Sequence, residues 1–181
     1  MLARAYLHDP QFVYVLPDEG ERLRRSPWFF SAVLRYSAAV GTLLAADGGA
    51  AILIPPGGHV ASFTRMLRSG LIAAPLRLGP SALSRLTAFA TASRDLRAAA
   101  VQGSFWYVGG IGVEPERQGE GIGTALMEEL GALAGDPLCL ETASERNVAW
   151  YERLGFEVIA EGRVPDGPRI WSMKRQVGSR V

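Results

Sequence analysis

The sequence has few cysteine and histidine residues, which excludes several kinds of catalytic centre. Cys139 is the only cysteine in 181 residues, so no internal disulfide and no Cys-based zinc site can form; we interpret it as a small core residue. The only histidines, His8 and His59, are far apart and have no cysteine or acidic neighbours at metal-ligand spacing. A Ser-His-Asp triad would need one of them, and no Gly-x-Ser-x-Gly motif supplies its nucleophile. We therefore expect neither a metal centre nor a serine hydrolase.

The chain also lacks an excess of one charge and a long hydrophobic run. Its 19 basic and 18 acidic residues give a net charge of +1, without the basic stripe of a nucleic-acid-binding module. No apolar run approaches the roughly 20 residues that span a bilayer, and residues 1–20 do not resemble a signal peptide. With 48% hydrophobic and 20% charged residues, the composition favours a soluble domain. We expect it in the cytoplasm, with no nucleic-acid or membrane partner.

The first hundred residues predict helices and one hairpin. Pro10 disfavours helix in the residue before it and so ends the first apolar segment. Ser26 and Pro27 are typical of an N-cap followed by the first helical position. Asp47-Gly48 between two apolar runs indicates a hairpin. The predicted elements are a helical segment over 2–8, a helix over 27–40, strands over 42–46 and 50–54, and helices over 62–71 and 81–96.

After residue 103 the pattern changes to alternating strands and helices. The predicted order is a strand over 105–113, a polar loop, a helix opened by the glycines at 119–123, a strand over 138–142, a helix over 144–154, and strands over 156–160 and 169–174. There is no internal repeat and no low-complexity linker. The pattern therefore favours one α+β or mixed α/β domain over residues 1–181.

The glycine-rich loop Gly119–Gly123 carries the clearest chemical signal. Its glycines let a ligand approach the backbone closely, and the first N–H groups of the following helix have no intrahelical partner. Together with the helix dipole they favour a phosphate or pyrophosphate. A Walker A ending is absent, and the spacing G-x-G-x-G departs from the dinucleotide fingerprint, although Glu141 lies about 20 residues further on. A turn that only caps the helix remains the alternative.

Two motifs resemble those of the GCN5-related N-acetyltransferases (GNAT family). Gln118, Gly121 and Gly123 match the acetyl-CoA-binding pattern Q/R-x-x-G-x-G/A, and Asn147–Phe156 is similar to a second motif that ends in Y-x-x-x-G-F. Weaker likenesses to the puromycin N-acetyltransferase-like branch occur at 9–10, 55–57 and 167–173. The resemblance implies a mixed, mostly antiparallel twisted sheet flanked by helices, with a splayed strand pair that holds acetyl-CoA.

The resemblance also implies acetyl-CoA as co-substrate, without a metal. In the family, free backbone groups of the splayed strand pair with the pantetheine arm, and the pyrophosphate lies over the amides of the glycine loop. We expect the side chain of Glu120 to point to solvent, because the loop contacts come from the backbone. The predicted cofactor-binding residues are Ile111, Gly112, Val113, Gln118, Gly119, Glu120, Gly121, Ile122, Gly123, Thr124, Asn147 and Tyr151.

Catalytic residues follow from the same resemblance. Tyr151 occupies the place of the family tyrosine that protonates the CoA sulfur, and Asn147 lies one turn earlier on the same helical face. For the general base we predict Glu141, acting through a water, with Glu114 as runner-up; a solvent-exposed carboxylate is the alternative interpretation of Glu141. Many family members carry Asn where this chain has Ser144, which can still donate a hydrogen bond.

The expected organisation is a cofactor core over about 104–175 and an N-terminal part, 1–103, that shapes the acceptor site through residues 28–36 and 62–96. The family usually has a strand before its first helix; here that strand is either absent or lies upstream of Met1. The predicted function is acetylation of a primary amine on a small molecule by direct attack in a ternary complex. A non-catalytic acyl-CoA-binding domain and a dinucleotide oxidoreductase are the alternatives. Oligomeric state is open, although homodimers are the commonest soluble assembly.

Overall fold

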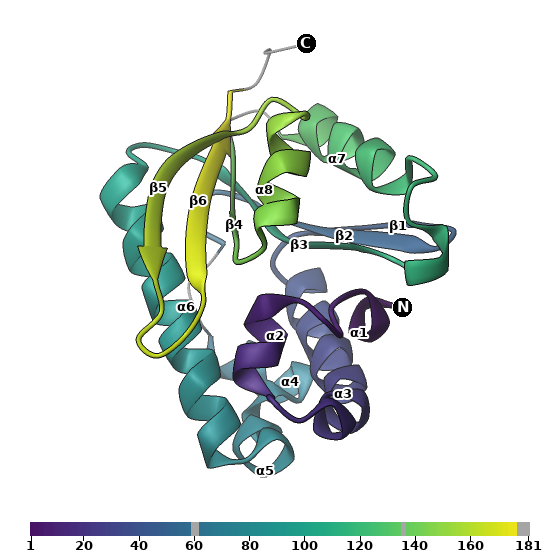
Figure 1. Ribbon diagram of the computed structural model, residues 1–181, viewed down its shortest axis with the longest axis vertical. Helices are drawn as coiled ribbons and strands as arrows, with labels where there is room; N and C mark the ends of the chain where they lie inside the picture. The colour runs from purple at the N-terminus through teal and green to yellow at the C-terminus, as the bar shows by residue number, and fades with distance from the viewer. Residues whose placement is uncertain (59–61, 135–136, 177–181) are drawn as a thin grey trace.

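The computed structural model describes residues 1–58, 62–134 and 137–176. The strands are β1 Thr42–Ala46, β2 Gly49–Ile54, β3 Trp106–Val113, β4 Leu138–Thr142, β5 Glu157–Arg163 and β6 Arg169–Arg175. The α-helices are α1 Leu2–Ala5, α2 Pro10–Val15, α3 Glu19–Ala38, α4 Phe63–Ser69, α5 Ala74–Leu78, α6 Pro80–Ala100, α7 Ile122–Leu133 and α8 Glu145–Glu152 (Figure 1), with 3₁₀ turns η1 Leu71–Ala73 and η2 Pro115–Arg117. His59, one of the two histidines of the sequence, lies outside the described residues.

The strands form one sheet in the order β1-β2-β3-β4-β6-β5. Every neighbouring pair is antiparallel except β3 and β4, which are parallel. This confirms the predicted mixed, mostly antiparallel α+β architecture. In the described residues no strand precedes α1, so the first strand of the sheet is the hairpin strand β1.

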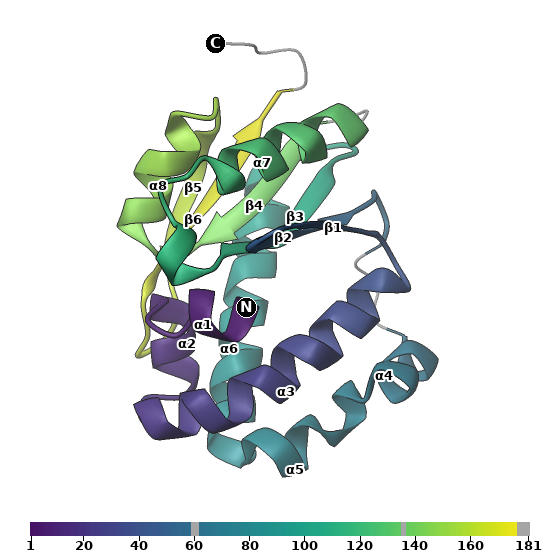
Figure 2. The same ribbon diagram turned by 90° about the vertical axis from the view of Figure 1, so that its right-hand side faces the viewer.

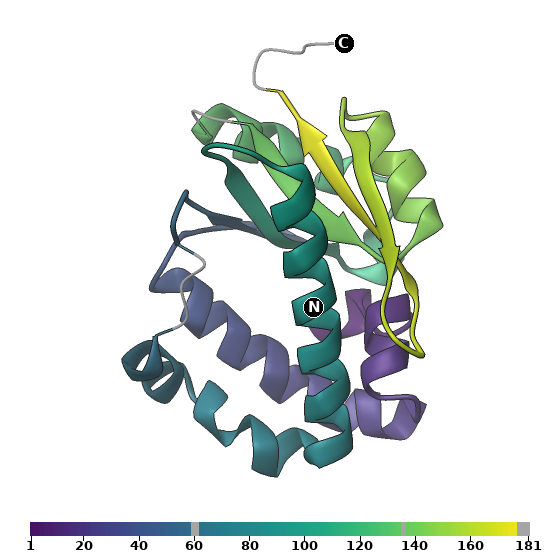
Figure 3. The same cartoon turned by 90° about the vertical axis from the view of Figure 1, so that its left-hand side faces the viewer.

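Helices cover both faces of the sheet. Figures 1 and 2 show α7 and α8 side by side on one face, and Figure 3 shows α6 running across the other. The main core lies between the sheet and the α7–α8 layer; its fully buried members include Leu130, Leu138 and Met173. A smaller cluster under α6 contains Phe89 and Ile170.

The predicted hairpin is present, whereas the predicted start of the long N-terminal helix is wrong. Helix α3 begins at Glu19, capped by the Asp18 side chain, which accepts the Glu21 N–H at 2.7 Å, and Pro27 lies inside the helix. The turns before Pro27 are fixed by the Arg22 guanidinium, which is buried and donates to three backbone carbonyls, those of Leu7, Leu16 and Pro17. These tertiary contacts stabilise the helical turns that precede Pro27, a residue that ordinarily interrupts a helix.

Candidate active site

The centre of the sheet opens where β3 separates from β4. The two strands pair only at Trp106–Leu138 and Tyr107–Cys139. Directly afterwards β3 contains a bulge, because Leu53 of β2 pairs with Val108 while Ile52 pairs with Gly110, which leaves Gly109 as the extra residue. Bulges bend a strand and are frequent beside active sites. The bulge therefore accounts for the opening that the sequence led us to expect.

The edge of β3 that faces the opening is covered by side chains of the protein itself. The Tyr6 hydroxyl donates to the Ile111 carbonyl at 2.9 Å and accepts the Ile111 N–H at 3.1 Å. The side-chain amide of Gln118 donates to the Val113 carbonyl at 3.4 Å. Tyr6 reaches this place because α1 packs on β3 at Gly112, where a Cβ atom would lie 2.7 Å from the Leu2 side chain.

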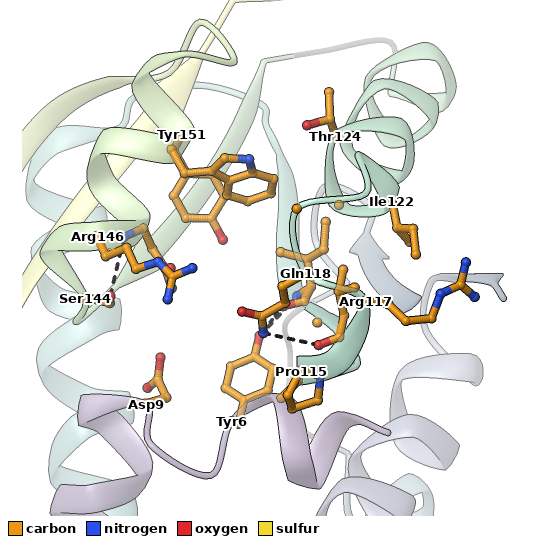
Figure 4. A pocket seen from close by; sticks show the side chains of 18 of the residues that line it. Tyr6, Asp9, Pro115, Arg117, Gln118, Ile122, Thr124, Ser144, Arg146 and Tyr151 are labelled. Atoms are coloured by element: carbon orange, nitrogen blue, oxygen red, sulfur yellow. Dashed lines mark hydrogen bonds between the residues drawn. The ribbon is translucent and has the colours of Figure 1, made fainter. Parts of the chain in front are cut away.

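A cavity of about 910 Å³ occupies the opening (Figure 4). Its walls come from the end of β3, the glycine loop, the start of α7, helix α8 and the α1–α2 turn. All predicted cofactor-binding residues line it except Glu120. Residues 28–36 and 62–96, which we expected to shape the acceptor site, do not line it; the N-terminal wall consists of Arg4, Ala5, Tyr6, His8, Asp9 and Pro10.

The glycine loop presents helix amides to this cavity. Gly121 is the N-cap of α7 with φ +83° and makes no side-chain capping bond, so it leaves the first N–H groups of the helix available to a ligand. At Gly123 a Cβ would lie 3.2 Å from the Trp150 ring, so a glycine allows α7 and α8 to approach closely. Arg146 and Arg153 of the α8 segment line the same cavity. Uncapped amides and guanidinium groups together suit an anionic ligand.

The side chain of Glu120 lies away from the cavity. It is exposed and accepts from Arg117 at 3.0 Å, and Arg117 also donates to Asp47 in the β1–β2 turn at 2.7 Å. This agrees with the expectation that Glu120 points to solvent. The negative charge is thereby directed out of a site suited to anions.

Helix α8 places Tyr151 and Asn147 on the cavity wall, as the sequence suggested. Ser144 caps the helix by accepting the Asn147 N–H at 3.4 Å. Figure 4 shows the Tyr151 hydroxyl pointing into the cavity, and in the described part of the chain that hydroxyl makes no hydrogen bond. Burial raises the pKa of Tyr151 well above its usual value, with further increases from Tyr6, Asp9 and Tyr107. Tyr151 therefore stays protonated and able to donate.

The prediction that Glu141 faces the cleft is wrong. Glu141 projects from β4 toward α6, on the other face of the sheet, where its carboxylate forms an ion pair with Arg97. It also accepts from the Tyr107 hydroxyl at 2.9 Å and from the Ser172 hydroxyl at 3.3 Å. Its side chain is only 2% exposed. Burial raises the pKa of Glu141, and the Arg97 guanidinium opposes that shift. This environment is that of a structural carboxylate.

Glu114 also lies outside the cavity lining. Its carboxylate pairs with the Met1 amino group at 3.5 Å and with the Arg4 guanidinium at 3.4 Å, which joins the start of the chain to the end of β3. Neither carboxylate predicted as general base therefore reaches the Tyr151 hydroxyl.

Sequence reasoning missed Tyr6 and Asp9 as site residues. Both lie in or beside the first helical turn, and their local context indicates only an apolar helix followed by a capped one. The weak likeness of Asp9-Pro10 to the family was the one signal at this place. In the described residues there is no group of three or more potential metal ligands. None of the described helices combines the length and hydrophobicity needed to span a bilayer.

Residues 84–158 match the model of the acetyltransferase (GNAT) domain. The match spans 75 of the 181 residues, from within α6 to the start of β5. A mycothiol acetyltransferase from Propionibacterium freudenreichii is 46% identical over 57 residues, which cover 28% of this chain and 18% of that protein. The chain thus aligns with less than a fifth of this relative. Assignment to the puromycin N-acetyltransferase-like branch stays a prediction.

Two solved structures resemble almost the whole chain. The first, described as histone acetyltransferase HPA2 and related acetyltransferase from Corynebacterium glutamicum, has a TM-score of 0.65 and 20% identity, and covers 99% of this chain and 89% of its own. Naa20 from Chaetomium thermophilum, in complex with a bisubstrate analogue, has a TM-score of 0.52 and 14% identity, covering 97% and 80%. These likenesses extend the acetyltransferase fold over the N-terminal helices.

Proposed function

We propose that this domain transfers the acetyl group of acetyl-CoA to a primary amine of a small molecule. The observation that carries the proposal is the cavity at the β3–β4 opening, where a strand edge, uncapped helix amides and the Tyr151 hydroxyl meet. The relative named as an acetyltransferase of mycothiol supports a small-molecule acceptor. Asp9 is the one carboxylate of the N-terminal wall, beside Arg4 and His8, which favours an acceptor with a single amine over a polycation.

In this proposal different residues of the cavity bind different parts of acetyl-CoA. The amides of the Gly119–Thr124 segment hold the pyrophosphate, helped by the guanidinium groups of Arg146 and Arg153. The edge of β3 that Tyr6 and Gln118 cover in this structure pairs with the pantetheine arm when they release it. Asn147 contacts the same ligand from α8.

Two groups of the cavity act on the reacting atoms. The Ile111 N–H points away from β2 toward the opening, so it can donate to the thioester carbonyl and to the oxyanion that develops there. The Tyr151 hydroxyl donates its proton to the departing thiolate. The acceptor amine attacks the carbonyl directly while both substrates are bound.

A thermal-shift titration with acetyl-CoA, CoA and NAD tests the proposal. A ligand that binds only the native protein at 100 times its Kd adds about 2.7 kcal/mol of stability, so we expect a clear rise in Tm with both CoA species and none with NAD. Stabilisation by NAD alone, or by none of the three, would contradict the proposed co-substrate.

Two glycine variants test whether acetyl-CoA binds at the glycine loop. Gly121 and Gly103 both have φ above +80°, and neither has an atom within 4 Å of a built Cβ, but only Gly121 borders the cavity. Replacing either by Ala strains the backbone by about 1 kcal/mol. We expect Gly121→Ala to weaken acetyl-CoA binding at least tenfold and Gly103→Ala to leave it unchanged.

Tyr6 should compete with acetyl-CoA for β3. Its hydroxyl makes both hydrogen bonds that Ile111 offers to the opening, and a hydrogen bond contributes about 0.5–1.5 kcal/mol net. We therefore expect Tyr6→Phe to bind acetyl-CoA about tenfold more tightly by calorimetry, since one such bond is equivalent to roughly that factor.

Tyr14→Phe is the matched control, because its hydroxyl also bonds a carbonyl, that of Pro165 at 3.2 Å, but outside the cavity. Weaker binding by Tyr6→Phe would mean that the Tyr6 hydroxyl contacts the co-substrate instead of yielding its place to it.

A further inference from the structure

Asp9 has two roles in the turn between α1 and α2. Its carboxylate accepts the Gln11 N–H at 2.9 Å and so caps the short helix α2. The same side chain lines the cavity, and Figure 4 shows its carboxylate directed inward from the α1–α2 turn while the Tyr151 hydroxyl enters from α8. The cap alone needs no charge, because Asn and Ser cap helices as well as Asp does.

The negative charge of Asp9 has no cationic partner among the described residues. Over residues 1–58, 62–134 and 137–176, no Arg, Lys or His forms an ion pair with it. Burial raises the pKa of Asp9 to about 6, against the opposing effect of the Gln11 and Phe12 amides. A partly buried carboxylate without a cation is unfavourable. The site therefore suits a ligand that brings a positive charge.

We propose that Asp9 receives the ammonium group of the acceptor and is the general base of the acetyl transfer. This inference rests on the acetyltransferase function proposed above. It gives the carboxylate that caps α2 a chemical role that neither Glu141 nor Glu114 can perform from its observed position.

The proton balance follows from the two groups that face the cavity. The Asp9 carboxylate takes one proton from the ammonium, and the free amine nitrogen attacks the thioester carbonyl. The C–N bond forms, the C–S bond breaks, and the sulfur leaves with the electron pair. The Tyr151 hydroxyl protonates that sulfur, and the second proton released by the nitrogen restores the hydroxyl. Asp9 then releases its proton to solvent, which completes the cycle.

Several groups around Asp9 determine how the reaction depends on pH. They are Tyr6 at the end of α1, His8 in the same turn, Arg22 from α3, which bonds the Leu7 carbonyl, and Tyr151 and Arg146 from α8. Burial raises the pKa of both tyrosines, so they stay neutral near pH 7. Guanidinium groups stay charged. His8 is adjacent to Asp9 in the sequence and lines the same cavity, so its effect is separated from that of Asp9 by mutation.

The decisive variant is Asp9→Asn, with Asp18→Asn as its matched control. Asp18 caps α3 in the same way but lies outside the cavity, and Asn preserves both caps. With acetyl-CoA and 2-phenylethylamine as probe, we expect kcat/KM of Asp9→Asn to fall at least 100-fold at pH 7.5. In the wild type, kcat/KM should fall as pH decreases through about 6. This decrease should disappear in Asp9→Asn and persist in Asp18→Asn and His8→Gln. A decrease that persists in Asp9→Asn, or is lost only in His8→Gln, overturns the assignment.

Two measurements do not depend on turnover. In the CoA complex, wild-type protein should bind 2-phenylethylamine at least tenfold more tightly than the uncharged 2-phenylethanol, and Asp9→Asn should lose this preference. Because folding raises the pKa of Asp9, its stabilising contribution is present below the unfolded value and is lost as pH rises through 6. Asp9→Asn should therefore raise Tm at pH 7.5, and this rise should disappear near pH 4.

These outcomes separate the inference from the function on which it rests. Failure of either CoA species to stabilise the wild-type protein contradicts the acetyltransferase proposal itself. Stabilisation by CoA combined with equal binding of the amine and the alcohol overturns the role of Asp9 alone.

Discussion

Replacing Tyr151 by Phe should lower kcat by about 100-fold or more while acetyl-CoA affinity stays within twofold. The hydroxyl points into the cavity without a partner in the described part of the chain, and burial keeps it protonated. A positioned proton donor contributes about 100-fold to 10,000-fold to a rate. The ring packs against Trp150 and Phe156 with centroid separations of 4.8 and 5.6 Å, and Phe preserves both contacts. Tm should therefore change little.

Tyr36→Phe is the control for this variant. The Tyr36 hydroxyl accepts the Ser62 N–H at 3.4 Å outside the cavity, so its loss should leave kcat unchanged. Single-turnover thiol release then measures the chemical step directly. Unaltered kcat in Tyr151→Phe would remove Tyr151 as the proton donor, whereas absence of thiol release from the wild-type protein would favour the alternative of a non-catalytic acyl-CoA-binding domain.

The parts of the site that lie in one contiguous segment could be predicted. The glycine loop leads into α7, and Tyr151 and Asn147 lie on one face of a single helix, so local geometry groups the residues within each segment, and the family resemblance indicated that both segments meet at the co-substrate. The hairpin was equally predictable, because Asp47-Gly48 fits a two-residue turn between paired strands.

Tyr6 and Asp9 could not be assigned in this way, because packing between distant segments gives them their roles. Tyr6 reaches Ile111, 105 residues away, only because α1 packs against Gly112. Asp9 lies before a proline and so indicates a helix cap, which it also is. No local sequence pattern distinguishes a helix cap that also faces a cavity from one that only caps its helix.

The case of Glu141 shows a limit of strand periodicity. Alternation puts Cys139 and Glu141 on one face of β4, and they do share it, with Cys139 fully buried and its thiol pKa raised to about 11 by burial. Alternation does not reveal which face borders the cavity. That depends on Tyr107 and Ser172 of the neighbouring strands and on Arg97 of α6, which together surround the carboxylate.

Replacing Arg97 by Met should destabilise the protein by about 3–5 kcal/mol, because removing one partner of a buried ion pair leaves the other charge uncompensated. The Glu141 side chain is 2% exposed, and the guanidinium also lies over the Tyr107 ring at 4.4 Å. Arg94→Met, on the same helix, removes only an exposed contact with Asp95 and should cost under about 1 kcal/mol. Urea unfolding compares the two variants.

The pH dependence of the free energy of unfolding tests whether the uncompensated charge of Glu141 causes the destabilisation in Arg97→Met. Without Arg97 the pKa of folded Glu141 rises further. The loss of stability in Arg97→Met is therefore largest above that pKa, and it decreases as pH falls and the carboxyl is protonated. Adding Glu141→Gln to Arg97→Met should restore most of the loss, because the Gln amide carries no charge, its oxygen still accepts from one of the Tyr107 and Ser172 hydroxyls, and its N–H can donate to the other. Where the variants stay folded, kcat should remain within about threefold of the wild type, since a structural carboxylate orders the sheet without touching the reacting atoms. If kcat of Arg97→Met/Glu141→Gln fell well below that of the wild type although stability was restored, Glu141 would have a catalytic role after all.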